Sequence, residues 1–171
     1  ASAPVAGLDV TFVVPTVPRG QGRGRASSHG GKARIHKASA DRTYEGTIAL
    51  AARAAMPAAI LDGPLRVDIA VIVPRPAYML KRDRRGAWKV DPGLVPCTAK
   101  PDVDNALKSV LDGMKACWRD DKQVCCGESF KFYAEVDGTP RLLVRVRSVI
   151  GERDMFARFM QVFPHGCNVP F

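Results

Sequence analysis

The chain has 171 residues and a formal net charge of +9, from 26 Lys and Arg against 17 Asp and Glu. This length suits one domain, and a hydrophobic content of 46% is enough to form a core. No run of about 18 or more apolar residues occurs, which argues against a membrane-spanning helix. The five cysteines form no Cys-x-x-Cys pair, which argues against a disulfide framework or zinc site. The opening ASAPVAG lacks signal-peptide features, so we expect a cytoplasmic protein with reduced thiols.

The first predicted elements are a strand, a basic loop and a helix. Residues 8–15 are rich in β-branched side chains and end at a proline, which is typical of a strand. Residues 19–42 are rich in Gly, Ser and Arg, and we interpret them as a loop that closes over phosphates. A helix is predicted over 41–56, because Asp41 can cap its start and Pro57 stops it.

A second strand and a second basic loop follow. Residues 65–73 alternate and then become continuously apolar, which predicts a strand near the centre of a sheet. Residues 75–100 form a long charged loop in which Tyr78 and Trp88 interleave with cations. These aromatic rings either stack on unpaired bases or cover the edge of the core.

The positive charge is concentrated in these two loops. Arg19 to Arg42 carries seven Lys or Arg against one Asp, and Arg75 to Asp91 carries six against two. Such clusters are typical of nucleic-acid binding, although a solvated surface loop has the same composition. The candidate DNA contacts are Arg19, Arg23, Arg25, Lys32, Arg34, Lys81, Arg82, Arg84 and Arg85.

Residues 100–123, KPDVDNALKSVLDGMKACWRDDKQ, gather five of the 17 acidic residues. A helix is predicted over 104–116, because Asp104 is a good N-cap. One face of this helix repeats apolar side chains at helical spacing, namely Leu107, Val110, Leu111 and Met114. Carboxylates gathered in a basic chain indicate a divalent-metal site, since their oxygens suit Mg²⁺ or Mn²⁺. The alternative is a capped helix with solvated charges.

The end of the chain is predicted to hold a β-hairpin and an extension. Residues 124–136 and 142–150 alternate apolar and polar side chains around a turn, and the adjacent Cys125 and Cys126 fall in the first strand. The extension 151–171 carries an apolar stripe at helical spacing, Met155, Phe159 and Phe163.

The segments PDVDNALK and WRDDKQV resemble the signature of RusA-type Holliday junction resolvases, endonucleases that cut branched DNA. The resemblance is strong over residues 100–124 and weaker over 15–57. It implies Mg²⁺-dependent phosphodiester hydrolysis, with Mn²⁺ as a possible substitute, by a homodimer acting on four-way junctions in DNA recombination and repair. The setting would be a bacterial cell or a phage-infected host, away from membranes.

The resemblance also assigns roles to individual residues. The catalytic residues carried over from the motif are Asp102, Asp104, Lys108 and Asp121, with the three aspartates as metal ligands. Asp112 and Asp120 also match family positions and are expected to support the site.

The expected fold is α/β (α+β), a single RusA-like domain over 1–171. It should contain one mixed sheet of about four or five strands packed by helices 41–56 and 104–116. The homodimer interface is expected at Phe130 and Phe132 or at the apolar stripe of the extension. Two other functions fit the same residues: a DNA nuclease with less preference for branched substrates, and a non-catalytic DNA-binding protein whose acidic cluster is structural.

Overall fold

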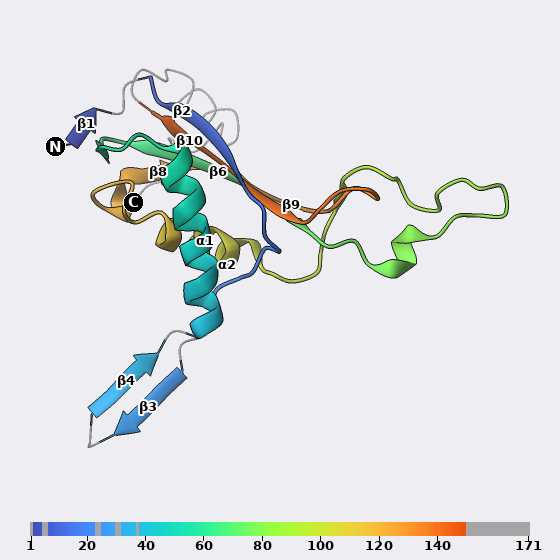
Figure 1. Cartoon of the computed structure of the whole chain (residues 1–171), viewed down its shortest axis with the longest axis horizontal. Helices are drawn as coiled ribbons and strands as arrows, with labels where there is room; N and C mark the ends of the chain where they lie inside the picture. The colour runs from blue at the N-terminus through green and yellow to red at the C-terminus, as the bar shows by residue number, and fades with distance from the viewer. Residues whose placement is uncertain (1, 5–6, 23–24, 30–31, 37, 150–171) are drawn as a thin grey trace, which may run out of the picture.

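The structure, a computed structural model, describes residues 2–4, 7–22, 25–29, 32–36 and 38–149, with the backbone alone for 2–4, 25–29 and 32–36. Over these residues the fold is α+β, with a mixed main sheet and two α-helices on one of its faces (Figure 1). The helices are α1 (Ser39–Ala55) and α2 (Val103–Gly113). The expected fold class is therefore confirmed.

The main sheet of the described residues has six strands, slightly more than the sequence predicts. Five of them lie in the order β2 (Asp9–Val14), β10 (Arg141–Ser148), β6 (Leu65–Val73), β9 (Ser129–Tyr133) and β7 (Val95–Pro96), and β8 (Val124–Cys126) also pairs with β6. The β6 strand matches its predicted bounds. The two vicinal cysteines lie in β8, as expected.

The core lies between the sheet and the two helices. Leu142, Val144 and Val146 of β10 are fully buried, and Ile48 of α1 is buried in the same apolar cluster. Each such side chain contributes about 1.5–3 kcal/mol on burial. The helices approach each other closely at Gly113, where a Cβ atom would lie 2.9 Å from the Cβ of Ile48.

The predicted hairpin over 124–150 is wrong. The β9 strand pairs with β6 in parallel, and β10 lies antiparallel between β6 and β2. The alternation of apolar residues showed which face of each strand is buried, but it carries no information on which strand lies alongside. Because β10 hydrogen-bonds on both edges, it is a central strand, and β9 is left close to the sheet margin.

The first basic segment is not a loop throughout, because β3 (Arg25–His29) and β4 (Lys32–His36) form an antiparallel two-stranded sheet. This sheet extends away from the main sheet beside the start of α1 (Figure 1). A further short pair, β1 (Ser2–Pro4) and β5 (Ile60–Asp62), is parallel.

The second basic segment projects as a long arm, which we define as residues 75–94 (Figure 1). It contains a 3₁₀ helix, η1 (Ala77–Leu80), and runs into β7. The predicted apolar stripe at Met155, Phe159 and Phe163 lies outside the described residues. No helix in the described ranges is long and apolar enough to cross a membrane.

Both helices begin earlier than predicted. The first starts at Ser39, so Asp41 lies inside the first turn and does not cap it; the N-cap position is Ala38. The second starts at Val103, which makes Asp102 the N-cap, and it ends at Gly113 rather than 116. The shift of one residue at α2 places both acidic residues of the Asp-x-Asp motif at the very start of the helix.

Candidate active site

Two carboxylates lie at the N-terminus of α2 with their oxygens available to a ligand. Asp102 occupies the N-cap position but makes no side-chain capping bond, and Asp104 lies in the first turn. Both side chains are exposed. A helix N-terminus favours negative charge, which helps to hold two carboxylates side by side. We define Asp102 and Asp104 as the acid pair.

Lys108 lies one helical turn beyond Asp104 on the exposed surface of α2. Residues four apart on a helix are neighbours on its surface, so the ammonium group lies within reach of a ligand bound at the acid pair. Among the described residues, neither Lys108 nor the acid pair has a side-chain hydrogen bond or ion pair, so all three groups are available to substrate.

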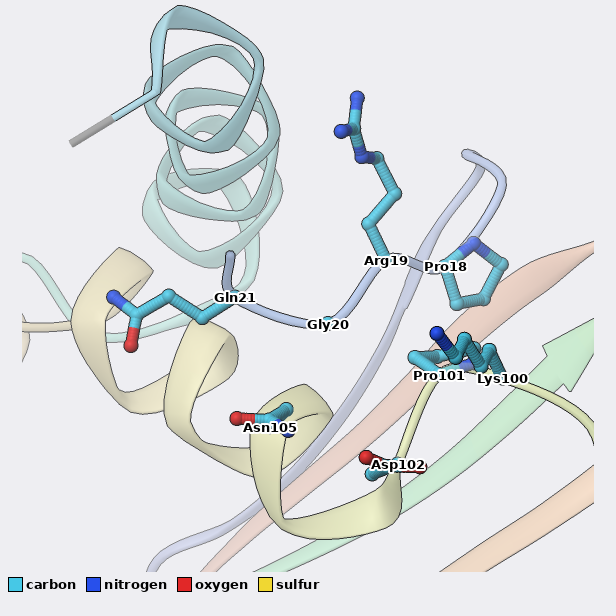
Figure 2. A pocket seen from close by; sticks show the side chains of 8 residues that line it. All are labelled: Pro18, Arg19, Gly20, Gln21, Lys100, Pro101, Asp102 and Asn105. Carbon is cyan, nitrogen blue, oxygen red and sulfur yellow. The ribbon is translucent and has the colours of Figure 1, made fainter. Parts of the chain in front are cut away.

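A pocket of about 400 Å³ opens beside Asp102 (Figure 2). Its walls combine the start of α2 with the segment that follows β2, and the lining residues are Pro18, Arg19, Gly20, Gln21, Lys100, Pro101, Asp102 and Asn105. Figure 2 shows Asp102 on one side of this space and the guanidinium of Arg19 pointing away from it on the other. The pocket therefore combines a carboxylate with two cationic residues, which suits a phosphate ester carrying a metal ion.

The segment over the pocket, residues 18–22, is hydrogen-bonded to α2 through Gln21 and to α1 through Gly22, and we call it the strap. The backbone N–H of Gln21 donates to the carbonyl of Asn105 at 3.3 Å, and its side-chain Nε2 donates to Oδ2 of Asp112 at 2.6 Å. The strap lies so close to α2 that a Cβ atom on Gly20 would be 3.1 Å from that of Asn105.

Asp112 therefore holds the strap in place. It lies near the C-terminal end of α2, whereas the acid pair lies at the N-terminal end. Its Oδ1 also pairs with Lys115 at 2.7 Å, and its side chain is 14% exposed. The hydrogen bond from Gln21 therefore gives Asp112, an acidic residue of the motif, a structural role within the chain.

Asp120 has a structural contact as well. It is the N-cap of the 3₁₀ helix η2 (Asp121–Gln123), where its Oδ1 accepts the N–H of Lys122 at 2.9 Å. The side chain of Gln123 completes this capping box and donates through Nε2 to the carbonyl of Gly63 at 2.9 Å. Two polar residues of the Asp-Asp-x-Gln motif therefore fix the loop after α2 to the start of β6.

Asp121 lies away from the acid pair within one chain. Its Oδ1 accepts the indole N–H of buried Trp118 at 3.0 Å, in a separate cavity of about 270 Å³. The strand that follows Asp121, β8, pairs with β6 at Leu65. The segment that precedes Asp102 is instead bonded to Lys131 of β9, which pairs with β6 at Val71. Six residues of β6, roughly 20 Å of strand, separate these two attachment points.

No group of three His, Cys, Asp or Glu side chains suited to a metal ion occurs in the described part of the chain. The acid pair alone still fits Mg²⁺, which typically binds one or two carboxylates and takes its other ligands from water and substrate phosphates. Of the three predicted ligands, Asp102 and Asp104 therefore lie together, and Asp121 lies in a separate cavity.

The arm carries exposed cations, and hydrogen bonds and a cation–π contact within the arm fix its shape. Oδ1 of Asp83 accepts the N–H groups of Arg85 and Ala87 at 2.8 and 2.9 Å, which fixes the turn at the tip. The guanidinium of Arg82 stacks 3.8 Å from the centroid of the Trp88 ring and donates to the carbonyl of Gly86 at 2.7 Å. Arg82 and Trp88 therefore stabilise the arm.

Tyr78 is 60% exposed, whereas Arg75 at the base of the arm donates to the carbonyls of Ala134 and Asp91, each at 2.7 Å. Lys81, Arg84 and Arg85 are exposed candidates for DNA contact. In the first basic segment Arg19 lines the pocket, Arg25, Lys32 and Arg34 lie on β3 and β4, and Arg23 lies outside the described residues.

Comparison with known proteins shows the family to which this chain belongs. The model of the endodeoxyribonuclease RusA family matches residues 15–147, from the end of β2 to near the end of β10. The chain is also 33% identical over 141 residues to the uncharacterized protein YqaN of Bacillus subtilis (strain 168), an alignment that covers 82% of this chain and 96% of that protein. The matched span contains the strap, the arm, the acid pair and Asp121, and on this evidence the chain belongs to the RusA endodeoxyribonuclease family.

Proposed function

We propose that this protein is a Mg²⁺-dependent endonuclease that resolves Holliday junctions and related branched DNA in recombination and repair. The observation that carries the proposal is the acid pair, two exposed carboxylates without partners among the described residues, at a helix N-terminus beside a pocket with two cations. Exposed carboxylates are stable at a helix N-terminus, and these two leave their oxygens unused by the described chain. This arrangement fits a site completed by a metal ion and a phosphate.

In this proposal Asp102 and Asp104 hold the ion, which would supply the Lewis acidity and the activated water for hydrolysis when bound. Lys108 approaches the scissile phosphate from the next turn of α2 and offsets the negative charge that develops on it. The N–H groups at the start of α2 favour the same anion. Arg19, on the opposite wall of the pocket, and Lys100, just before the start of α2, contact neighbouring phosphates.

The DNA itself is attracted by the arm and by the segment from the strap through β4. Lys81, Arg84 and Arg85 project from the arm, so each is free to neutralise one phosphate of a duplex branch. The exposed ring of Tyr78 is placed to stack on a base at the branch point. The carboxylates repel DNA until a cation neutralises them, so binding and cleavage depend on different groups.

Resolution requires paired cuts, and we propose that a C2 homodimer provides the two sites. The separation of Asp121 from the acid pair gives a second reason for a dimer, because Asp121 of the partner subunit is then available to complete the ligand set. An exposed aromatic surface on β9 supports the proposal. Phe130 is 46% exposed, and its ring stacks on that of Phe132 with centroids 6.3 Å apart.

The decisive experiment compares a four-way junction, a three-way fork and a linear duplex as substrates, each with Mg²⁺ and with EDTA. We expect Mg²⁺-dependent, symmetrically paired cuts in the junction and little cleavage of the linear duplex. Equal cleavage of all three substrates indicates a less selective nuclease, and tight binding without cleavage indicates a DNA-binding protein.

A matched pair of variants ties any activity to the acid pair. Asp104→Asn should abolish cleavage, whereas Asp137→Asn, at an exposed aspartate in the turn between β9 and β10, should cleave like wild type. If both variants cleave at the wild-type rate, the acid pair does not hold the metal.

A further inference from the structure

One buried carboxylate has no part in the chemistry proposed above. Asp41 on α1 is 5% exposed, which makes it the most buried acidic side chain in the described part of the chain. A buried carboxylate is costly unless it is paired or hydrogen-bonded. Its contacts therefore indicate what it is for.

The carboxylate of Asp41 contacts the strap at two places. Its Oδ2 accepts the backbone N–H of Gly22 at 3.1 Å, and its Oδ1 lies 4.0 Å from the guanidinium of Arg19. The approach to Gly22 is so close that a Cβ atom there would lie 3.0 Å from the carboxylate oxygen. One carboxylate thus fixes the backbone at one end of the strap and attracts the cation near the other.

Arg19 lines the pocket on the wall opposite Asp102 (Figure 2). Its side chain is 52% exposed, so its head is accessible to a ligand while it is near Asp41. Asp102 is the competing partner, since it is an exposed carboxylate in the same pocket. An Arg19 side chain released from Asp41 would be drawn across the pocket and would neutralise one half of the acid pair.

We propose that Asp41 is a positioning residue that keeps Arg19 on the α1 side of the pocket, ready to bind a DNA phosphate next to the scissile one. This inference rests on the proposed function, because it takes the occupant of the pocket to be a phosphodiester of DNA. The hydrogen bond between Gln21 and Asp112 fastens the same strap to α2. The strap is therefore attached to both helices just after Arg19.

The test is a double-mutant cycle on junction binding, measured in Ca²⁺ at fixed ionic strength. Asp41→Asn retains an oxygen that can accept the Gly22 N–H but removes the charge that attracts Arg19. We expect Asp41→Asn and Arg19→Ala each to weaken binding by about threefold to tenfold. In the Arg19→Ala background, Asp41→Asn should change binding by less than twofold, because the residue it acts through is already gone.

Asp62→Asn is the matched control, since Asp62 also pairs with an arginine, Arg119 at 3.0 Å, but lies outside the pocket. It should bind the junction like wild type in both backgrounds. A second readout is Mn²⁺ binding without DNA. Asp41→Asn should weaken it if Arg19 moves to Asp102, and adding Arg19→Ala should restore it.

The inference is overturned if Asp41→Asn weakens binding equally with and without Arg19, since that result would make Asp41 a purely structural anchor. A thermal melt of each variant shows whether the fold is kept. If Asp41→Asn unfolds, Asp41→Glu replaces it in the cycle, because the longer carboxylate keeps the charge but displaces the strap. Failure of the proposed function gives a different result, because it is seen in the wild-type protein, as absent junction binding, absent Mg²⁺-dependent cleavage or equal cleavage of junction and linear duplex.

Discussion

The ammonium group of Lys131 on β9 donates a hydrogen bond to the carbonyl oxygen of Pro101 at 3.0 Å. It donates a second to the carbonyl of Ala99 at 2.6 Å. These bonds fasten the segment just before Asp102 to the main sheet, so the position of the acid pair depends on a residue outside the acidic motif. The sequence alone does not point to Lys131, because its partners are about thirty residues away and are backbone atoms.

We therefore predict that Lys131→Met lowers the single-turnover cleavage rate by about tenfold or more. Two charge-assisted hydrogen bonds disappear, and each is worth about 1.5–3 kcal/mol. Junction affinity should change little, because Lys131 is directed at the chain itself. The measurement is the single-turnover rate and Kd side by side, with Lys122→Met as control, since Lys122 is 90% exposed beside Asp120. A large loss of affinity with a normal single-turnover rate would instead make Lys131 a DNA contact.

The second prediction concerns Lys108. Replacement by Ala should abolish turnover and leave the melting temperature nearly unchanged, because an exposed helix position tolerates Ala well. Lys108→Arg should restore only part of the rate, since the planar guanidinium differs in shape and hydration from a compact ammonium. Normal cleavage by Lys108→Ala would show that this lysine has no part in the reaction.

The third prediction separates the cations of the arm by their contacts. Neutralising Lys81, Arg84 and Arg85 should reduce the slope of log Kd against log salt by about 0.9 for each phosphate that the variant no longer neutralises. Arg82→Ala should act differently, because Arg82 stacks on Trp88 and its removal loosens the arm. We expect increased proteolysis of the arm in that variant. An unchanged slope in the triple variant would move the DNA surface away from the arm.

The fourth prediction concerns pH and the chain segment between β9 and β10. Two hydrogen bonds from Arg141, at 3.0 and 2.7 Å, lower the pKa of Glu135 from 4.5 to about 2. A carboxyl whose pKa is lower in the folded state stabilises the fold above pH 4.5, and this stabilisation is lost as the pH falls toward 2. Because the side chain is 36% exposed, the contribution should be about 1 kcal/mol or less.

The measurement is the free energy of unfolding of wild type and Glu135→Gln across this pH range. The variant should be less stable at about pH 6, and the difference should shrink below pH 4.5 and vanish near pH 2. A difference that stays constant with pH would mean that the carboxylate charge contributes nothing through Arg141.

The sequence predicts the parts of this fold that depend on local order. Residues 65–73 form a strand with the predicted bounds, because their apolar run has a clear start and end. The acid pair is also readable from its motif and from its place at a helix start. The insertion of β10 between β2 and β6 is not readable, since alternation specifies a face but no neighbour. The strap is equally hidden, because Gln21 and Asp112 are 91 residues apart.

The last prediction concerns the third carboxylate of the predicted ligand set. Asp121 and Asp102 line two separate cavities within one chain, so we expect each site to use Asp121 of the partner subunit. Light scattering should first show a particle of about twice the chain mass of 18.5 kDa. Asp102→Asn and Asp121→Asn homodimers should each bind junctions without cutting them, because a metal ligand is removed while the shape of the protein stays the same.

Mixing these two inactive variants distinguishes shared sites from sites within one chain. In a mixed dimer with shared sites, the intact Asp102 of one chain meets the intact Asp121 of the other, so one of the two sites is wild type. We expect the mixture to regain nicking of one strand and to make few paired cuts. If each site belonged to a single chain, both sites of the mixed dimer would stay defective, and the mixture would be as inactive as its components.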